Sequence, residues 1–183
     1  MKNVMLIGAL LASSMTFSQT SELIGKVVDD FTDKVYISAN SSVFFEDSGD
    51  QRTQGMIIDQ FLDLDKKGKI EVGTLYVKVA GLDTSCVEEG KLYLIFENGE
   101  KRELSSWKKF NCDGENYFKL TDAMVDILKS SPLVGIKYTN GRNFESMIVK
   151  NTLNSENSNY FINIFSEVDN INQGLVELAV VKN

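Results

Sequence analysis

The chain has 183 residues, of which 43% are hydrophobic and 25% are charged, a composition typical of a globular protein. Its formal charge is −7, and an acidic surface repels phosphate backbones and anionic headgroups, so we expect no nucleic-acid binding and no binding to membrane surfaces. Histidine is absent, which excludes Ser-His-Asp and Cys-His nucleophiles and removes the commonest zinc and haem ligand. We therefore expect no cofactor and no catalytic residue.

The first eighteen residues have the pattern of an export signal. Lys2 supplies a positive start, residues 4–11 form a short apolar run, and residues 16–18 (TFS) match the small-x-small pattern that signal peptidase recognises. The apolar run is too short to cross a bilayer. We predict a signal peptide over residues 1–18, a single β-rich domain over 19–183, no membrane insertion after cleavage, and a periplasmic or secreted location.

After the signal the pattern is mostly of short strands separated by turn residues. Apolar residues alternate with polar ones, or predominate, over residues 33–38, 42–45, 56–64 and 69–82. Gly73 lies inside the last of these segments and predicts a β-bulge.

The clearest local signal is Asn98-Gly99, which separates residues 91–96 from residues 101–104. Both residues tolerate the positive φ values of a type I′ turn. We therefore predict a β-hairpin at this position.

A second Asn-Gly pair, at residues 140–141, joins residues 133–139 to residues 142–150. A strict two-residue turn would place Ile136 opposite Glu145 and mix the two faces of the sheet. We expect a bulge or a longer loop to correct this register.

Two helices are expected. Thr121 is a suitable N-cap for the first, and Pro132 ends it. The second is predicted over residues 158–172, where apolar residues recur with helical spacing, and Gly174 supplies its C-cap. A last strand is expected over residues 176–181. Sparse helices without regular βαβ alternation predict a β-rich α+β fold, with an antiparallel sheet or sandwich and one or two helices.

Cys86 and Cys112 are the only cysteines. Two cysteines in an exported protein most often pair, so we predict a disulfide between them. The alternative is a reactive thiol, favoured at Cys112 by the neighbouring lysines 108 and 109. It has little support, because neither cysteine lies in a C-x-x-C pattern and no histidine is present to lower a thiol pKa.

Two acidic segments are candidates for cation binding. Residues 63–68 (DLDKKG) resemble the opening of a calcium loop, but Lys67 stands where an oxygen ligand belongs and Thr74 where a bidentate glutamate belongs. A hairpin turn explains the same residues. Residues 46–50 (EDSGD) bring three carboxylates together, but a solvated acidic loop is the favoured interpretation. We therefore expect no metal site.

Trp107 is the only tryptophan, and it lies in a short segment that ends at Phe110, just before Cys112. An exposed aromatic beside polar residues can stack on a sugar ring or anchor a partner protein, so Trp107 and Phe110 are candidate ligand contacts. The alternative, which we favour, is that both rings cover an open edge of the core. The exposure of Trp107 distinguishes the two interpretations.

Several short segments carry a family resemblance. They are SCVEEG (85–90), LIF (94–96) with the Asn-Gly pair after it, FNC (110–112), DFT (30–32) and FSQ (17–19). In these segments the chain resembles uncharacterised exported β-rich proteins of Bacteroidetes-type bacteria. The resemblance implies a β-rich exported domain and an envelope location, and it brings no catalytic residue and no ligand.

For function, we expect an exported, non-enzymatic binding or structural module of the cell envelope, with a protein or a glycan as the partner. The alternative is a small carboxylate-based hydrolase acting on polysaccharide, because glycosidases need only two acids at a set separation. Four carboxylates lie near the cysteines in the sequence: Glu88, Glu89, Glu103 and Asp113.

Overall fold

The computed structural model describes residues 19–28, 32, 34–47, 54–80, 86–107, 110–142, 144, 146–150 and 152–181. Its helices are α1 (Asp122–Ser130) and α2 (Ser155–Asn172). Its strands are β1 (Gln19–Val28), β2 (Val35–Ala39), β3 (Ser42–Asp47), β4 (Gln54–Leu64), β5 (Ile70–Ala80), β6 (Val87–Glu88), β7 (Lys91–Phe96), β8 (Lys101–Ser105), β9 (Phe110–Asn111), β10 (Glu115–Lys119), β11 (Leu133–Thr139), β12 (Ser146–Lys150) and β13 (Val176–Val181).

The strands form a large sheet, a small sheet and a short ribbon. The large sheet has the order β10-β5-β4-β2-β1-β13, and β3 also pairs with β4. The small sheet has the order β12-β11-β7-β8, and β6 pairs with β9 in the ribbon. All of these pairs are antiparallel except β1 with β13, which run parallel. The predicted β-rich α+β class with two helices is confirmed.

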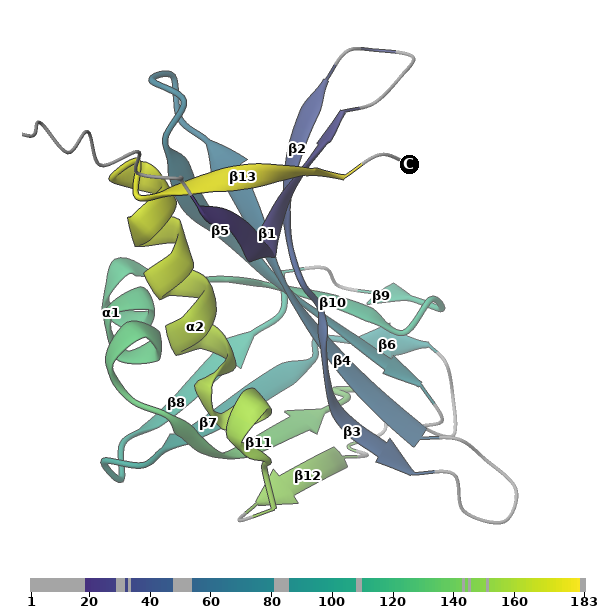
Figure 1. Cartoon of the computed structure of the whole chain (residues 1–183). Helices are drawn as coiled ribbons and strands as arrows, with labels where there is room; N and C mark the ends of the chain where they lie inside the picture. Colours follow the sequence, from purple (N-terminus) through teal and green to yellow (C-terminus); the bar gives the residue numbers. More distant parts are fainter. Residues whose placement is uncertain are drawn as a thin grey trace, which may run out of the picture.

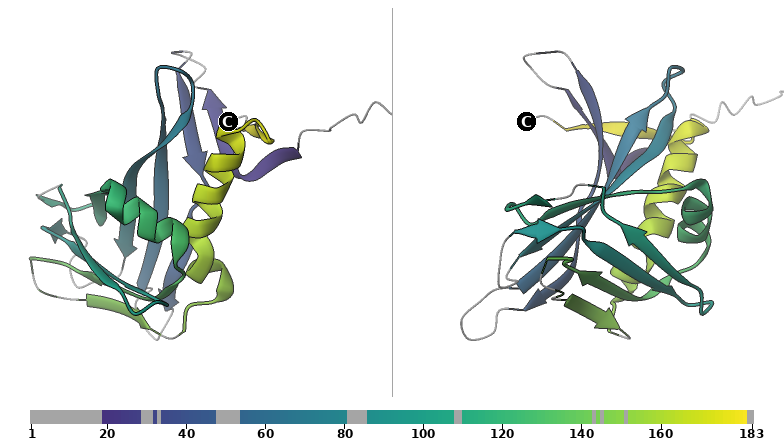
Figure 2. Two further views of the ribbon diagram at one scale, coloured as in Figure 1. Left: turned by 90° about the vertical axis from the view of Figure 1, so that its left-hand side faces the viewer. Right: turned by 180° about the vertical axis from the view of Figure 1, so that it is seen from behind.

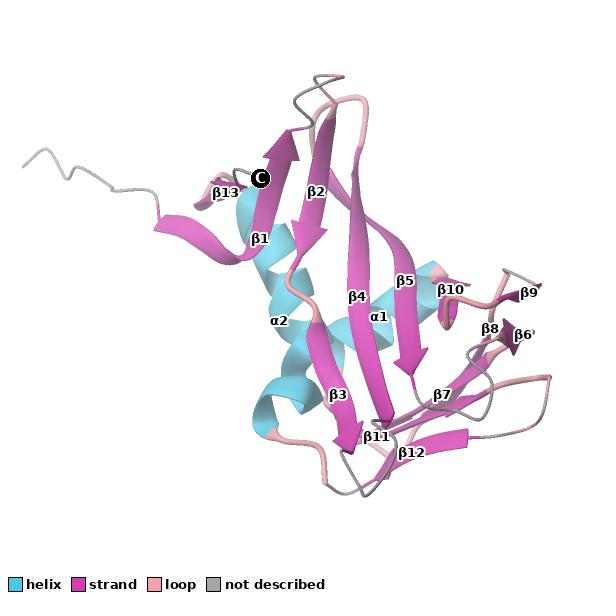
Figure 3. Ribbon diagram, turned by 90° about the vertical axis from the view of Figure 1, so that its right-hand side faces the viewer, coloured by secondary structure: helices cyan, strands magenta, loops and turns pink. Residues whose placement is uncertain are grey.

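Both helices lie on one side of the large sheet. Figure 2 (left) shows them in front of the strands, and Figure 3, from the opposite side, shows the strands in front of the helices. Helix α2 packs against α1 and against strands of both sheets, which are β1, β3, β5, β11 and β13. The small sheet closes the lower end of the molecule (Figure 1). One face of the large sheet is therefore left without a helix. Within the described residues, neither helix is long and apolar enough to cross a membrane.

The two sheets share one hydrophobic core. A buried polar contact also joins them, because the Asn116 side-chain amide of β10 donates to the hydroxyl of Tyr138 in β11 at 2.8 Å. Gly90 packs against this pair, and a Cβ there would lie 2.6 Å from Asn116 Oδ1. Only a residue without a side chain fits at that point.

Helix α1 confirms its sequence signals, since the Thr121 side chain accepts from the Met124 amide and the helix ends before Pro132. Helix α2 begins three residues earlier than predicted. The side chain of Asn154 accepts from the amide of Asn157 at 2.8 Å, which makes Asn154 the N-cap and Ser155 the first helical residue. The polar residues of this first turn carry no apolar periodicity, so the sequence pattern showed only the later turns.

The predicted hairpin joins β7 to β8, but its turn differs from the expected type I′. Ile95 pairs with Lys101, and the Phe96 amide donates to the Glu100 carbonyl, so three residues form the loop. Of these, only Gly99 has a positive φ, of 83°. This is the geometry of a three-residue loop that ends in a glycine bulge.

The second Asn-Gly pair confirms the expected longer loop, since Thr139 pairs with Ser146 and Ile136 lies opposite Val149. Asn140 is fully buried, and its side chain accepts from the Glu88 amide and donates to the Cys86 carbonyl. This loop therefore anchors the segment that begins the ribbon.

The bulge predicted at Gly73 is present. The β4–β5 register shifts between Gln60 and Leu62, which pair with Leu75 and Val72 respectively. The extra residue on β5 places Leu75 and its alternate neighbours in the core and turns the intervening side chains outward.

Candidate functional site

Four aromatic side chains meet on the face of the large sheet that carries no helix. Phe61 in β4, Tyr76 in β5 and Tyr117 in β10 each alternate with buried neighbours, so they point away from the core. Trp107 joins them because its amide donates to the Tyr117 carbonyl at 3.1 Å. We call Phe61, Tyr76, Tyr117 and Trp107 the aromatic surface.

The rings of the aromatic surface form one continuous series of contacts. Ring centroids lie 5.5 Å apart for Phe61 and Tyr76, 5.2 Å for Tyr76 and Tyr117, and 5.7 Å for Tyr117 and Trp107. The outermost rings are open to solvent, with 64% of Trp107 and 41% of Phe61 exposed. Tyr76 and Tyr117 are half-buried between them. The surface therefore has a fixed centre and exposed ends.

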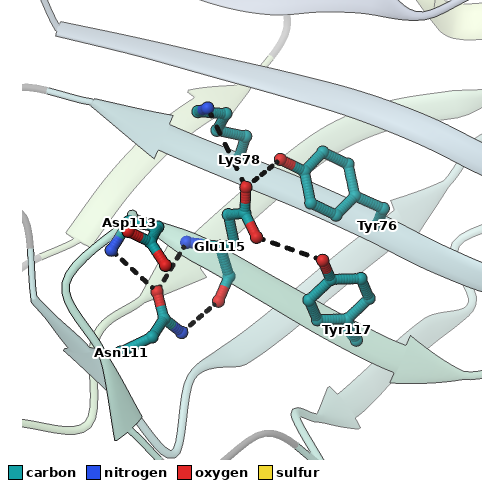
Figure 4. A network of polar contacts seen from close by, with 6 residues as sticks. All are labelled: Tyr76, Lys78, Asn111, Asp113, Glu115 and Tyr117. Atoms are coloured by element: carbon teal, nitrogen blue, oxygen red, sulfur yellow. Dashed lines mark hydrogen bonds and ion pairs between the residues drawn. The ribbon is translucent and has the colours of Figure 1, made fainter.

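Glu115 holds the two central rings in place (Figure 4). Its two carboxylate oxygens accept from the hydroxyls of Tyr76 and Tyr117, each at 3.1 Å, and Lys78 Nζ lies 3.9 Å from the same group. Burial raises the pKa of both tyrosines, and the hydrogen bond to the Glu115 carboxylate raises it further. Both phenols therefore stay neutral donors at ordinary pH.

Asn111 in turn fixes the start of β10, as Figure 4 shows. Its side-chain amide donates to the Glu115 carbonyl at 2.6 Å, while its oxygen accepts from the amides of Asp113 and Glu115. The position of Glu115 is thus set by the turn that follows the ribbon. Asn111, which holds this turn, is next to the disulfide cysteine Cys112 in the sequence.

A pocket of about 530 Å³ opens beside Trp107. The polar residues that line it are Asp63, Thr74 and Lys119. Gly73 borders the pocket, and a Cβ there would lie 2.7 Å from Asp63 Oδ2. The absence of a side chain at Gly73 leaves room beside the Asp63 carboxylate, and the pocket borders the exposed Trp107.

Asp59 lies in β4 directly opposite Tyr76. One of its oxygens accepts from the hydroxyl of Ser41 at 3.1 Å. Burial raises the pKa of the Asp59 carboxyl, and the hydrogen bond from Ser41 opposes that rise. This carboxylate adds negative charge close to the central rings.

The predicted disulfide between Cys86 and Cys112 is present, with an S–S distance of 2.03 Å. The cysteines flank the ribbon in which Val87 pairs with Asn111. The bond therefore links the segment entering β7 of the small sheet to the segment entering β10 of the large sheet.

The favoured interpretation of Trp107 as a core residue is wrong, because its side chain is largely exposed. Phe118, the inward neighbour of Tyr117, is fully buried, so the core below this strand is already filled. Phe110 is also exposed, at 53%, and its ring faces the Arg142 guanidinium at 5.6 Å. Among the ring contacts of the described residues, Phe110 makes none with the aromatic surface.

Of the two acidic segments considered for cation binding, one contributes Asp63 to the pocket beside Trp107. The segment 63–68 covers the end of β4 and most of the β4–β5 turn, in which Asp65 Oδ1 accepts from two backbone amides. This confirms the hairpin interpretation. In the second acidic segment, residues 48–50 lie outside the described part of the chain. The side chains of residues 46 and 47 are not described either.

The four carboxylates near the cysteines do not share one environment. Glu88 and Glu89 are exposed in and after β6, and Asp113 is exposed in the turn before β10. Glu103 lies in the small sheet, where it pairs with Lys91 at 2.6 Å. The sequence missed the carboxylate that organises the aromatic surface, Glu115.

No protein-family model, curated protein or solved structure matches the chain significantly. The chemistry of the aromatic surface is therefore taken from its own side chains. They offer exposed ring faces together with carboxylate, hydroxyl and ammonium groups in one patch.

Proposed function

We propose that the protein is an exported, non-enzymatic binding module of a bacterial cell envelope, and that its aromatic surface holds a neutral glycan. The observation that carries the proposal is the exposed indole of Trp107 beside a pocket lined by Asp63, Thr74 and Lys119. Sugar rings present apolar C–H faces and hydroxyl edges, so a receptor needs an aromatic face next to hydrogen-bonding groups. This pocket provides both.

A pre-ordered surface favours binding. The two central tyrosines are held by Glu115, and the turn before β10 is held by Asn111 and by the nearby disulfide. Groups that are already ordered lose little conformational entropy on binding. A rigid receptor of this kind fits a flexible chain of sugars, which itself loses freedom when it binds.

The charges around the rings favour a neutral glycan over an acidic one. Three acidic residues lie near the rings, compared with two basic ones. The acidic residues are Asp59, Asp63 and Glu115, and the basic ones are Lys78 and Lys119. The whole chain carries a formal charge of −7. An acidic polysaccharide would be repelled both near the rings and at long range.

Export is proposed from the sequence pattern of residues 1–18 and is supported by the disulfide, since disulfides persist in oxidising compartments. The resemblance to exported proteins of Bacteroidetes-type bacteria leads to the same proposal. N-terminal sequencing of the protein recovered from the periplasm or medium of a bacterial host should give Gln19 as the first residue. A cytoplasmic chain that retains Met1 would contradict export.

Affinity electrophoresis tests the glycan. The acidic protein migrates toward the anode in a native gel, and a gel containing a soluble neutral polysaccharide (a mixed-linkage glucan, a xyloglucan or a galactomannan) should retard it. Trp107→Ala should weaken the retardation at least about tenfold, the effect of losing an aromatic residue that anchors the ligand. The melting temperature should change little, because Trp107 is exposed.

Phe144→Ala is the matched control, since Phe144 is 80% exposed, lies in the loop after β11, and is in none of the ring contacts of the described residues. It should be retarded like the wild type. Phe110→Ala measures whether the second predicted contact takes part. Release of reducing ends from the same polysaccharides would favour the hydrolase, whereas equal retardation of wild type and Trp107→Ala would reject the aromatic surface as the site.

A further inference from the structure

The small sheet carries a second surface of different chemistry on its outer face. A groove of about 420 Å³ crosses β12, β11, β7 and β8. Its floor is apolar, with Ile95 and Tyr93 half-buried and Ile148 59% exposed. Gly135 lies in the middle of this floor, between Ile95 and Lys150 in the register of the strands. Gly135 has no side chain, and a Cβ there would lie 3.5 Å from Ile95 Cδ1 and 3.5 Å from Lys150 Cγ.

Three lysines surround this floor. Lys150 and Lys101 end the row that contains Gly135 and Ile95, and Lys137 lies in the next row between Ile148 and Tyr93. The Lys137 ammonium lies 5.5 Å from the centroid of the Tyr93 ring, which holds it over the groove. The cations are thus arranged around an apolar centre.

The charge of these lysines is not balanced within the groove. Among the ion pairs of the described residues, none involves Lys101, Lys137 or Lys150. The acidic residue of the lining, Glu103, is already paired with Lys91 at 2.6 Å. A chain with a formal charge of −7 therefore presents a locally cationic groove here.

We propose that this groove binds an aliphatic carboxylate, that is, a free fatty acid. The acyl chain would lie on Ile95, Ile148 and the ring of Tyr93, and the carboxylate would meet the ammonium groups at the rim. A polysaccharide would leave the apolar floor without a complement, and a nucleic acid would be repelled by the net charge of the protein. The apolar floor and the cationic rim together match an amphipathic anion.

The site is independent of the proposed glycan surface, since no residue of the aromatic surface lines this groove. A fatty acid and a glycan could therefore bind the same molecule together. Failure of either proposal leaves the other untouched, and Trp107→Ala should bind the fatty acid like the wild type.

Titration with cis-parinarate, a fatty acid whose fluorescence rises in apolar surroundings, tests the proposal. The methyl ester of parinarate has the same chain without the charge, and we expect it to bind at least about tenfold more weakly. The combined variant Lys101→Gln, Lys137→Gln and Lys150→Gln should bind the acid at least about tenfold more weakly than the wild type, because each exposed ion contact contributes modestly and three are lost. Added salt should weaken binding of the acid and not of the ester.

The matched control is Lys66→Gln, Lys67→Gln and Lys69→Gln, which removes the same charge from the exposed β4–β5 turn and should leave parinarate binding unchanged. Gly135→Leu fills the groove while keeping the lysines. Its Cβ meets its neighbours at an ordinary 3.5 Å, and the variant should lose binding of the acid. Circular dichroism shows whether it folds, and the lysine variant decides the question if it does not.

Three results would overturn the proposal. The first is equal binding of the acid by wild type and the groove lysine variant. The second is equal binding of acid and ester by the wild type. The third is lysine-dependent sedimentation with phosphatidylglycerol vesicles without binding of monomeric parinarate, which would assign the groove to a membrane surface.

Discussion

The outer faces of the two sheets differ in how they use their charged residues. On the large sheet, the Glu115 carboxylate accepts from two tyrosine hydroxyls and lies near the Lys78 ammonium. Its charge therefore orders two aromatic rings. On the small sheet, Lys101, Lys137 and Lys150 surround an apolar floor and pair with no carboxylate of the described residues. The first face is ordered and nearly balanced, and the second is cationic. We propose that a neutral glycan binds the first face and an aliphatic anion binds the second.

The largest expected change in stability comes from removing the disulfide, and the unfolding curve also shows whether the two sheets unfold together. Replacing Cys86 and Cys112 together by serine should lower the free energy of unfolding by about 3–4 kcal/mol, because the bond closes a loop with a sequence separation of 26. Urea denaturation followed by circular dichroism measures this loss. We expect a single transition in both proteins. Separate transitions for the two sheets would show that the faces fold independently.

A smaller effect is expected where the sheets meet inside the core. Tyr138→Phe removes the hydroxyl that accepts from the Asn116 amide, leaving a buried amide without its partner, and should cost about 1–3 kcal/mol. Burial raises the pKa of the Tyr138 phenol, so the loss should be similar across neutral pH. Tyr36→Phe, at a tyrosine that is 52% exposed, is the control in thermal unfolding. Equal melting temperatures for the two variants would contradict a role for the contact.

The ordering of the aromatic surface by Glu115 predicts a change in phenol titration. Glu115→Gln removes the carboxylate that raises the pKa of Tyr76 and Tyr117, so both pKa values should fall. Carbon NMR of the tyrosine Cζ atoms follows each phenol through alkaline pH. Glu103→Gln, which removes a carboxylate from the other sheet, should leave the titration of Tyr76 and Tyr117 as in the wild type. Glycan affinity should fall about threefold as the rings lose their common anchor.

The smallest effect concerns Asp59, at the edge of the aromatic surface. Burial raises its carboxyl pKa above the ordinary 3.8, so the native state binds more protons than the unfolded state just above that pH. Stability should therefore fall as the pH rises through this window. Asp59→Asn should be more stable than the wild type at pH 7, by on the order of 0.5 kcal/mol, and the difference should vanish at lower pH.

Ser41→Ala tests the same carboxyl by removing its hydrogen-bond donor while keeping Asp59. The hydrogen bond from Ser41 lowers the pKa of this carboxyl, so its removal should move the window to higher pH. Melting temperatures of the three proteins from pH 3 to pH 8 would show both shifts. A constant difference between wild type and Asp59→Asn over that range would contradict the account.

The sequence predicted most of the strands in which apolar and polar residues alternate regularly. Strands β7, β11 and β13 have the expected bounds, because apolar side chains alternate or apolar residues fill the segment. Strand β1 was not predicted, since its buried residues follow no period of two and its pairing with β13 shifts register. Strand β10 was missed because its inward positions include a polar residue, Asn116.

The candidate site was less predictable than the fold. Trp107 and the disulfide were visible because each involves a rare residue type. The other rings come from β4, β5 and β10, which are distant in sequence, and only the strand pairing brings them together. Tyr76 could have been found from its outward position beside Leu75 and Val77. The partner strands of β5 could not have been inferred from that pattern.

The fluorescence of the only tryptophan tests the central claim most directly, since every indole signal comes from Trp107. In the free protein, we expect emission like that of tryptophan in water and strong quenching by iodide. A neutral polysaccharide that binds should shift the emission to shorter wavelength and protect the indole from iodide. Emission typical of a buried indole in the free protein, or a spectrum unchanged by a polysaccharide that retards the protein in the gel, would contradict the claim that Trp107 is an exposed contact of the glycan site.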